Sequence, residues 1–177
     1  MKRILTCVIA AVLALSLFAG CGQEVKPNGT GSGNQGSGSG SNSQAAELDL
    51  NKAYQALLDM QTSDDELVML EAGDDEQNAY YPGLSDITLK QRVFYMAPVS
   101  GFACEVLMVE TENAADAKKV KDIFQKRIDD AASDTIYPDT AELWQKNAQV
   151  QTQGDYVCMI VLPDGYTIPD NIFSLAE

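Results

Sequence analysis

The stretch from residue 102 to residue 132, FACEVLMVETENAADAKKVKDIFQKRIDDAA, decides the fold class of this chain. Its first part, residues 102–111, is an apolar run of the length and composition of a β-strand. Its second part changes to a helical period, with charged residues between apolar ones every three or four positions: Ala117, Val120, Phe124, Ile128 and Ala131. The stretch therefore predicts a strand that leads into a long amphipathic helix beginning at Asn113.

Further strands are predicted on both sides of this helix. Residues 92–98 form a strand before the quoted one, and Pro98 and Gly101 between the two favour a hairpin. Residues 148–163, AQVQTQGDYVCMIVLP, predict two more strands that turn at Gly154.

Shorter helices complete the expected pattern. Residues 47–60 show helical spacing with Asp49 or Asn51 as a cap. Short helices are also expected in residues 84–93, in residues 141–147 with Asp139 or Thr140 as a cap, and near the C-terminus. Two hairpins flanking a helix predict an α+β domain, with a mostly antiparallel sheet of about four strands. We expect the long central helix and the shorter helices to cover one face of that sheet.

The N-terminus predicts export. Lys2 and Arg3 precede an uncharged run from Ile4 to Gln23, which is typical of a secretory signal peptide. Residues 18–21, FAGC, resemble the lipobox of bacterial lipoproteins, with Phe18 at the position where Leu is usual. The resemblance implies cleavage before Cys21 and attachment of diacylglycerol to its thiol. Two acyl chains make a stable anchor, since each buried methylene contributes about 0.8 kcal/mol.

Three segments are expected from this reading. Residues 1–20 are a lipoprotein signal peptide, residues 21–44 are the acylated Cys and a tether, and residues 45–177 are one globular domain. The tether prediction rests on residues 27–43, which include six glycines and contain no charged and no apolar side chain. An uncleaved membrane helix and ordinary secretion remain alternatives. The apolar stretch Ile4–Ala19 has 16 residues, however, slightly fewer than the roughly 17–25 that span a bilayer.

The charge of the expected domain limits the kinds of partner that it can bind. Residues 45–177 contain nine Lys and Arg against 25 Asp and Glu, which gives a net charge of −16. Such a field opposes binding to nucleic acid and to anionic lipid, because both present phosphates. The expected partners are the membrane, through diacylglycerol on Cys21, and an envelope protein or cell-wall ligand. The expected location is the extracellular face of the cell membrane.

The residue types of most catalytic sites are missing. The chain has no histidine, which removes the commonest general base and metal ligand. We expect no cofactor, no metal and no catalytic residue. The acidic clusters Asp64–Glu66 and Asp74–Glu76 lack the spacing of a calcium loop and are interpreted as solvated loops. A carboxylate pair for glycoside hydrolysis stays open, because its separation is not visible in a sequence.

The two cysteines of the expected domain are Cys104 and Cys158. A disulfide between them is one possibility in an exported protein. Two buried thiols are the other, because free Cys is among the most buried residue types.

The order and spacing of several sequence motifs resemble those of a known family over most of residues 48–161. The matching features include Glu105 in the second strand, Arg127 in the long helix, Tyr137-Pro138, and Gly154 followed by Tyr156-Val157. In these features the chain is similar to domain-of-unknown-function family 4358, which occurs in lipoproteins of Clostridia and related Gram-positive bacteria. The resemblance implies a lipoprotein and no established activity.

Three side chains are candidates for a ligand site. Arg127 borders the apolar face of its helix, where it would either pair with Glu105 or bind an anionic ligand. Trp144, with Tyr137 and Tyr156, would either pack in the core or form an aromatic platform for carbohydrate. We expect a non-catalytic binding module at the cell envelope. A cell-wall hydrolase with a carboxylate pair is the alternative, and a small structural or inhibitory domain is a third reading.

Overall fold

Five strands form one antiparallel sheet in the computed structural model, which describes residues 47–62, 67–99 and 101–176. The sheet has the order β1-β2-β3-β5-β4, and all neighbours are antiparallel. The strands are β1 (Leu70–Glu71), β2 (Leu89–Met96), β3 (Glu105–Thr111), β4 (Gln149–Gln153) and β5 (Tyr156–Val161). Both expected hairpins, and with them the α+β class, are confirmed. The edge strand β1 was not predicted, because two residues are too few to display an alternating pattern.

Four α-helices and two 3₁₀ turns accompany the sheet. They are α1 (Leu50–Asp59), α2 (Asp74–Tyr80), α3 (Ala114–Ala132), α4 (Pro138–Asn147) and the 3₁₀ turns η1 (Leu84–Asp86) and η2 (Ile172–Ala176). The side chain of Asn113 caps α3 by accepting hydrogen bonds from the backbone N–H groups of Ala115 and Asp116. The expected cap of α4 was wrong, because the helix begins at Pro138 and contains both Asp139 and Thr140. Proline suits this first position, where its missing N–H costs no hydrogen bond.

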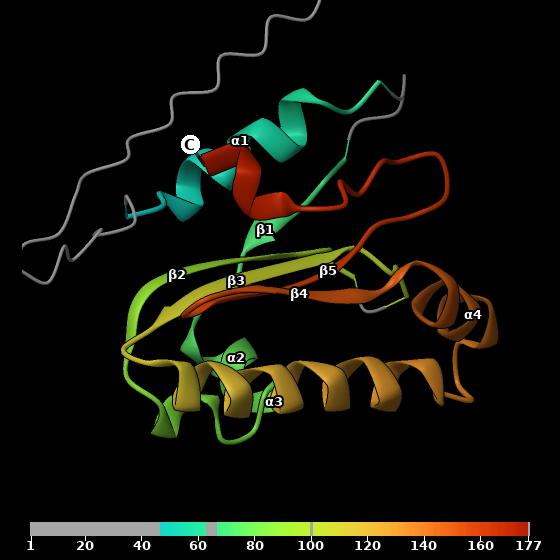
Figure 1. Ribbon diagram of the computed structural model, residues 1–177. Helices are drawn as coiled ribbons and strands as arrows, with labels where there is room; N and C mark the ends of the chain where they lie inside the picture. The colour runs from blue at the N-terminus through green and yellow to red at the C-terminus, as the bar shows by residue number, and fades with distance from the viewer. Residues whose placement is uncertain (1–46, 63–66, 100, 177) are drawn as a thin grey trace, which may run out of the picture. The chain divides into compact units, whose positions relative to one another are not determined.

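Helices cover both faces of the sheet, which corrects the expectation of one covered face. Figure 1 shows α1 and η2 together on one side, and α2 and α3 on the other. All seven residues of the central strand β3 are buried as a result. A continuous apolar strand of this kind is typical of a sheet covered on both sides.

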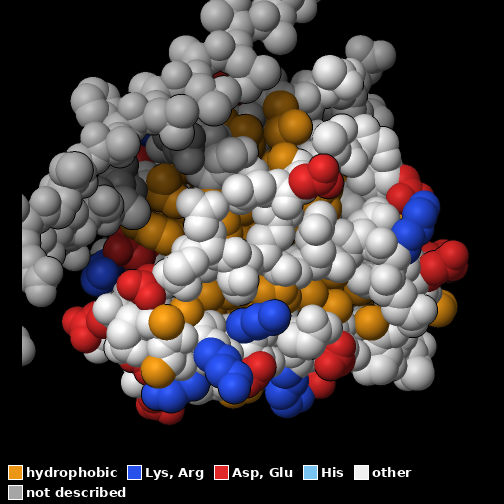
Figure 2. Space-filling model, in the orientation of Figure 1, with side chains coloured by type: hydrophobic (Ala, Val, Ile, Leu, Met, Phe, Trp, Pro, Cys, Tyr) orange, Lys and Arg blue, Asp and Glu red, His pale blue; other side chains and the backbone are white. Residues whose placement is uncertain are grey.

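The two faces have separate cores. On one face, Val106 and Met108 of β3 pack with Leu57 of α1 and Phe173 of η2. On the other face, Leu107 of β3 belongs to a cluster with apolar residues of α3 and α4: Ala117, Val120, Phe124, Ile128 and Trp144. The apolar residues that recur every three or four positions in α3 are therefore the ones that pack toward the sheet. In the view of Figure 2, Lys and Arg side chains gather over α3, interspersed with acidic ones.

Two segments before β3 differ from expectation. Residues 84–93 were expected to be helical, but only Leu84–Asp86 form a 3₁₀ turn and β2 follows from Leu89. Pairing with β3 stabilises this segment as a strand, since Leu89 lies opposite Thr111. The cluster Asp74–Glu76 forms the first turn of α2 and not a loop. Acidic side chains are favourable at the N-terminal end of a helix, where the helix dipole is positive.

Several expectations lie outside the described residues. They concern the signal peptide, Cys21, the tether and the acidic cluster at residues 64–66. Among the helices in the described part of the chain, none combines the length and the apolar character that crossing a membrane requires.

Candidate functional site

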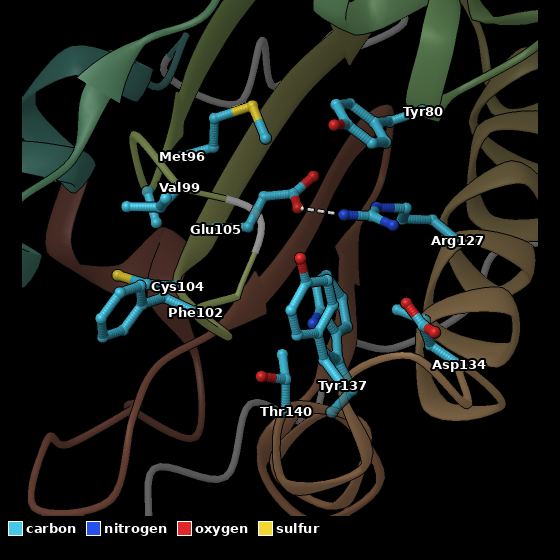
Figure 3. A pocket seen from close by; sticks show the side chains of 13 residues that line it. Tyr80, Met96, Val99, Phe102, Cys104, Glu105, Arg127, Asp134, Tyr137 and Thr140 are labelled. Atoms are coloured by element: carbon cyan, nitrogen blue, oxygen red, sulfur yellow. Dashed lines mark hydrogen bonds and ion pairs between the residues drawn. The ribbon is translucent and has the colours of Figure 1, made fainter.

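A cavity of about 230 Å³ lies beside the connection between β2 and β3. Its walls come from segments far apart in the sequence: Glu105 from β3, Arg127 from α3, Trp144 from α4 and Tyr80 from the end of α2. Figure 3 shows Glu105 and Arg127 extending toward each other, with Tyr80 on one side of them and Tyr137 on the other. The structure thus brings together the three side chains predicted as a site, Glu105, Arg127 and Trp144.

Glu105 and Arg127 form a buried ion pair. The Nη2 atom of Arg127 donates to Oε2 of Glu105 at 2.8 Å, and the side chains are 16% and 3% exposed. Burial alone would lower the pKa of Arg127, but the charge and hydrogen bond of Glu105 outweigh it and the pKa is raised. Arg127 therefore keeps its charge at neutral pH. The pairing alternative from the sequence is the one that the structure contains.

Two aromatic rings hold the guanidinium of Arg127 in place. Its central carbon lies 4.6 Å from the ring centroid of Tyr80 and 4.7 Å from that of Trp144. Such cation–π contacts strengthen when water is excluded. The Nε atom is buried and has no hydrogen-bond partner among the described residues. The ion pair and the rings together fix the orientation of this side chain in the cavity wall.

Tyr81 is a third member of this network, and sequence analysis missed it. The residue is fully buried, and its hydroxyl donates a hydrogen bond to Oε1 of Glu105. Its ring meets Phe94 and Phe124 edge to face, with centroids 5.5 Å away in both cases. Burial, followed by the charge of Glu105, raises the pKa of Tyr81 well above its ordinary value. Tyr81 is consequently a neutral donor that occupies the second oxygen of the carboxylate.

The acidic side chains of the cavity are engaged in structural contacts. Tyr81 and Arg127 bind the two carboxylate oxygens of Glu105. The other acidic side chain in the wall, Asp134, accepts a hydrogen bond from the backbone N–H of Ile136 at 2.7 Å. Within the described ranges, no group of three or more acidic or cysteine side chains could hold a metal ion. The arrangement is suited to binding by shape and stacking.

The predicted aromatic platform is wrong in one member. Trp144 and Tyr137 line the cavity, but Tyr156 lies on the opposite face of the sheet. There its hydroxyl accepts a hydrogen bond from the backbone N–H of Leu48 at 3.1 Å. Trp144 is 3% exposed and belongs to the core, whereas Tyr137 is 46% exposed at the cavity mouth. The sequence positions of these three aromatic residues could not reveal this division between faces.

Cys104 and Cys158 are both buried free thiols, so the disulfide alternative is wrong. The register of the sheet gives the reason. Glu105 lies opposite Val161, and Met108 lies opposite Cys158. Cys104 therefore lies about four residues along the strands from Cys158, which is roughly 13 Å at the usual rise per residue. A disulfide requires Cα atoms within about 7 Å.

Apolar side chains remain exposed around the cavity. The large hydrophobic residues that are exposed in the described part of the chain are Val68, Leu70, Val99, Phe102, Ile136 and Tyr137. Val99, Phe102 and Tyr137 line the cavity itself. A second hollow, of about 400 Å³, lies between Val68 and Phe102. In the sequence Val99 lies in the predicted hairpin connection and Phe102 at the start of the predicted strand, and neither was recognised as part of a site.

The fold and site define an α+β domain with a cavity whose wall contains a buried ion pair beside aromatic rings. Residues 61–162 match the model of the family described as Domain of unknown function (DUF4358), and the chain belongs to this family. No curated protein and no solved structure showed significant similarity to the chain. The family assignment agrees with the resemblance noted in the sequence.

Proposed function

We propose that the chain is a membrane-anchored extracytoplasmic lipoprotein whose folded domain is a non-catalytic binding module of the cell envelope. One observation carries the binding role. Exposed large apolar side chains line adjoining hollows, and both acidic side chains of the 230 Å³ cavity, Glu105 and Asp134, already have hydrogen-bond partners. Exposed apolar patches of this kind are typical of interaction sites.

The alternative, a cell-wall hydrolase, has less support. Glu105 and Asp134 line the same cavity, as a carboxylate pair would. Glu105 is held by Tyr81 and Arg127, however, and lies deep in the wall with 2% of its surface exposed. A catalytic acid or base must reach the proton that it transfers. Incubation of the protein with purified cell wall is therefore expected to release no soluble fragments. Release that Glu105→Gln abolishes would favour the hydrolase.

The proposed anchor rests on the sequence of residues 18–21 and on the charge of the chain. A domain with a net charge of −16 over residues 45–177 has no electrostatic attraction to an anionic bilayer, so lipid on Cys21 would supply membrane attachment. Mass spectrometry of the mature chain is expected to find diacylglycerol on Cys21 as its first residue. Cys21→Ala should remove the lipid and shift the protein from the membrane fraction to the medium or to an unprocessed form. Unchanged retention of the processed variant in the membrane fraction would refute the anchor.

The binding role has its own test. The side chain of Phe102 is 64% exposed, so replacing it should leave the fold intact. Crosslinking on intact cells, with a photoreactive residue at position 102, is expected to give a discrete adduct. A photoreactive residue at Asp122, which is exposed on α3, is the matched control. Equal and diffuse labelling at both positions would contradict a binding site at the cavity.

A further inference from the structure

We infer that the surface around the β2–β3 connection docks a basic peptide segment of a partner protein, with one large apolar side chain inserted into the Arg127 cavity. This inference rests on the proposed binding function and names the chemistry of the partner. We call this surface the docking face and define it by the exposed apolar residues that line its hollows: Val68, Leu70, Val99, Phe102 and Tyr137.

The docking face is continuous, although its residues come from three parts of the chain. Val99 and Phe102 line both the Arg127 cavity and the hollow beside Val68. Pro98 lines that hollow and also a third one, of about 330 Å³, beside Leu70. The hydroxyl of Thr140 donates to the backbone oxygen of Gly101 at 2.7 Å and so fastens the connection to α4. The three hollows thus adjoin one another through shared residues of this connection.

The size of the Arg127 cavity favours one inserted side chain over a whole small molecule. Sites for small ligands usually enclose about 300–1,000 Å³ and bury most of the ligand. The Arg127 cavity, at about 230 Å³, is below that range and suits one large side chain. In Figure 3 Phe102 and Val99 lie on the side of the cavity opposite Asp134, so an inserted side chain would have apolar and acidic neighbours. A peptide could fill this cavity and extend over the two neighbouring hollows.

The charges around the docking face favour a basic partner. Glu71 and Glu76 line the third hollow, and Asp134 lines the Arg127 cavity. The one cation in the three linings is Arg127, and Glu105 neutralises it inside the wall. The net charge of −16 over residues 45–177 adds a long-range field of the same sign. That field attracts Lys and Arg and repels both a second copy of this chain and anionic lipid.

The test is a selection of random linear peptides displayed on phage against the full chain in detergent. We expect the enriched peptides to combine two or more Lys or Arg with at least one aromatic or large aliphatic residue. Raising the salt concentration from about 0.1 M to about 1 M shortens the Debye length from about 10 Å to about 3 Å. Affinity of a selected peptide should fall several-fold over this range, mainly through slower association.

Variants locate the binding. Phe102→Ser and Val99→Ser should each weaken the Kd of the selected peptide by about tenfold or more, as truncation of a central apolar contact does. Circular dichroism verifies that both variants are folded. The charge variants Glu71→Gln and Asp134→Asn are compared with Glu112→Gln and Asp122→Asn, which are exposed elsewhere. The first pair should weaken binding more than the second pair, whose effect should remain within about twofold.

Each other outcome overturns the inference in its own way. Selected peptides that bind the docking face but carry no basic residues would refute the basic partner while leaving the proposed binding function intact. Peptides whose affinity ignores Phe102→Ser and Val99→Ser would refute the docking face. A concentration-dependent dimer that Phe102→Ser abolishes would assign the face to a second copy. Binding to anionic vesicles that Phe102→Ser abolishes would assign it to lipid. Failure to select any peptide, with no adduct at position 102 on cells, would also remove the proposed function.

Discussion

Replacing Arg127 by methionine should destabilise the protein much more than an ordinary substitution on a helix. The variant leaves the carboxylate of Glu105, which is 3% exposed as a side chain, with the Tyr81 hydroxyl as its remaining partner. Removing one member of a buried ion pair typically costs about 3–5 kcal/mol, because the other charge stays buried. Methionine preserves most of the aliphatic packing between Tyr80 and Trp144, so the loss reports mainly on the charge.

Glu105→Gln should cost less, about 2–3 kcal/mol, which is the range for a lost hydrogen bond to a charged group. The amide still accepts from Tyr81, and Arg127 keeps its two ring contacts. The double variant has no buried charge at this position. We therefore expect it to be no less stable than Arg127→Met alone, with a coupling energy of about 2–3 kcal/mol.

Urea denaturation followed by circular dichroism measures this cycle. The matched control is the ion pair between Lys126 and Asp130 on the same helix, with Nζ and Oδ2 2.6 Å apart and both side chains more than 60% exposed. Lys126→Met with Asp130→Asn should give a coupling energy below about 0.5 kcal/mol. Equal coupling in the two cycles, or additive losses at Glu105 and Arg127, would refute the reasoning that burial makes this pair important.

Three further predictions concern the core and the helices. Cys104 and Cys158 should resist alkylation at pH 8 in the folded chain, because burial raises the pKa of both thiols, that of Cys104 to about 12. Peptide mass spectrometry measures the extent of alkylation. Rapid labelling without denaturant would contradict their burial. Burial, followed by the charge of Tyr95, raises the pKa of Tyr54 from 10.0 to about 12, so its contribution to stability is complete below pH 10 and is lost as the pH rises toward 12. Tyr54→Phe should therefore make the free energy of unfolding fall less steeply over that interval, and an unchanged slope would speak against the shift. Asn113→Ala removes the cap of α3 and should lower the free energy of unfolding in urea by about 1 kcal/mol, whereas Asn113→Ser keeps an oxygen that can accept the capping hydrogen bonds and should lower it less.

The elements with a strong period were predictable from the sequence, and those stabilised by distant contacts were not. Residues 113–132 display the period of α3 and its cap, because one face of the helix packs on the sheet over its whole length. The two-residue strand β1 exists through pairing with Tyr95 and Met96, which no local pattern encodes. The second covered face depends on η2, whose residues Ile172 and Phe173 join α1 from the far end of the chain.

The candidate site was predictable in its charges but not in its partners. Glu105 was conspicuous as a charge within an apolar strand, and Arg127 as a charge at the edge of an apolar helix face. Tyr80 and Tyr81 carry no comparable signal in the sequence, although the ring of Tyr80 stacks on Arg127 and the hydroxyl of Tyr81 binds Glu105. Those contacts join the C-terminal end of α2 to α3 and β3, and a sequence does not display such contacts between distant elements.

The joint placement of α1 and η2 determines how much chain a folding unit needs. Both elements, Leu50–Asp59 and Ile172–Ala176, lie outside residues 61–162, the range that matches the family model. A fragment cut to that range would lose the segments that cover one side of the sheet. It would present to water a set of side chains that are fully buried in the intact fold: Val106, Met108, Cys158 and Ile160. Such a fragment is expected to aggregate, so studies of related proteins should extend the excised region by a helix at its start and by a short turn at its end.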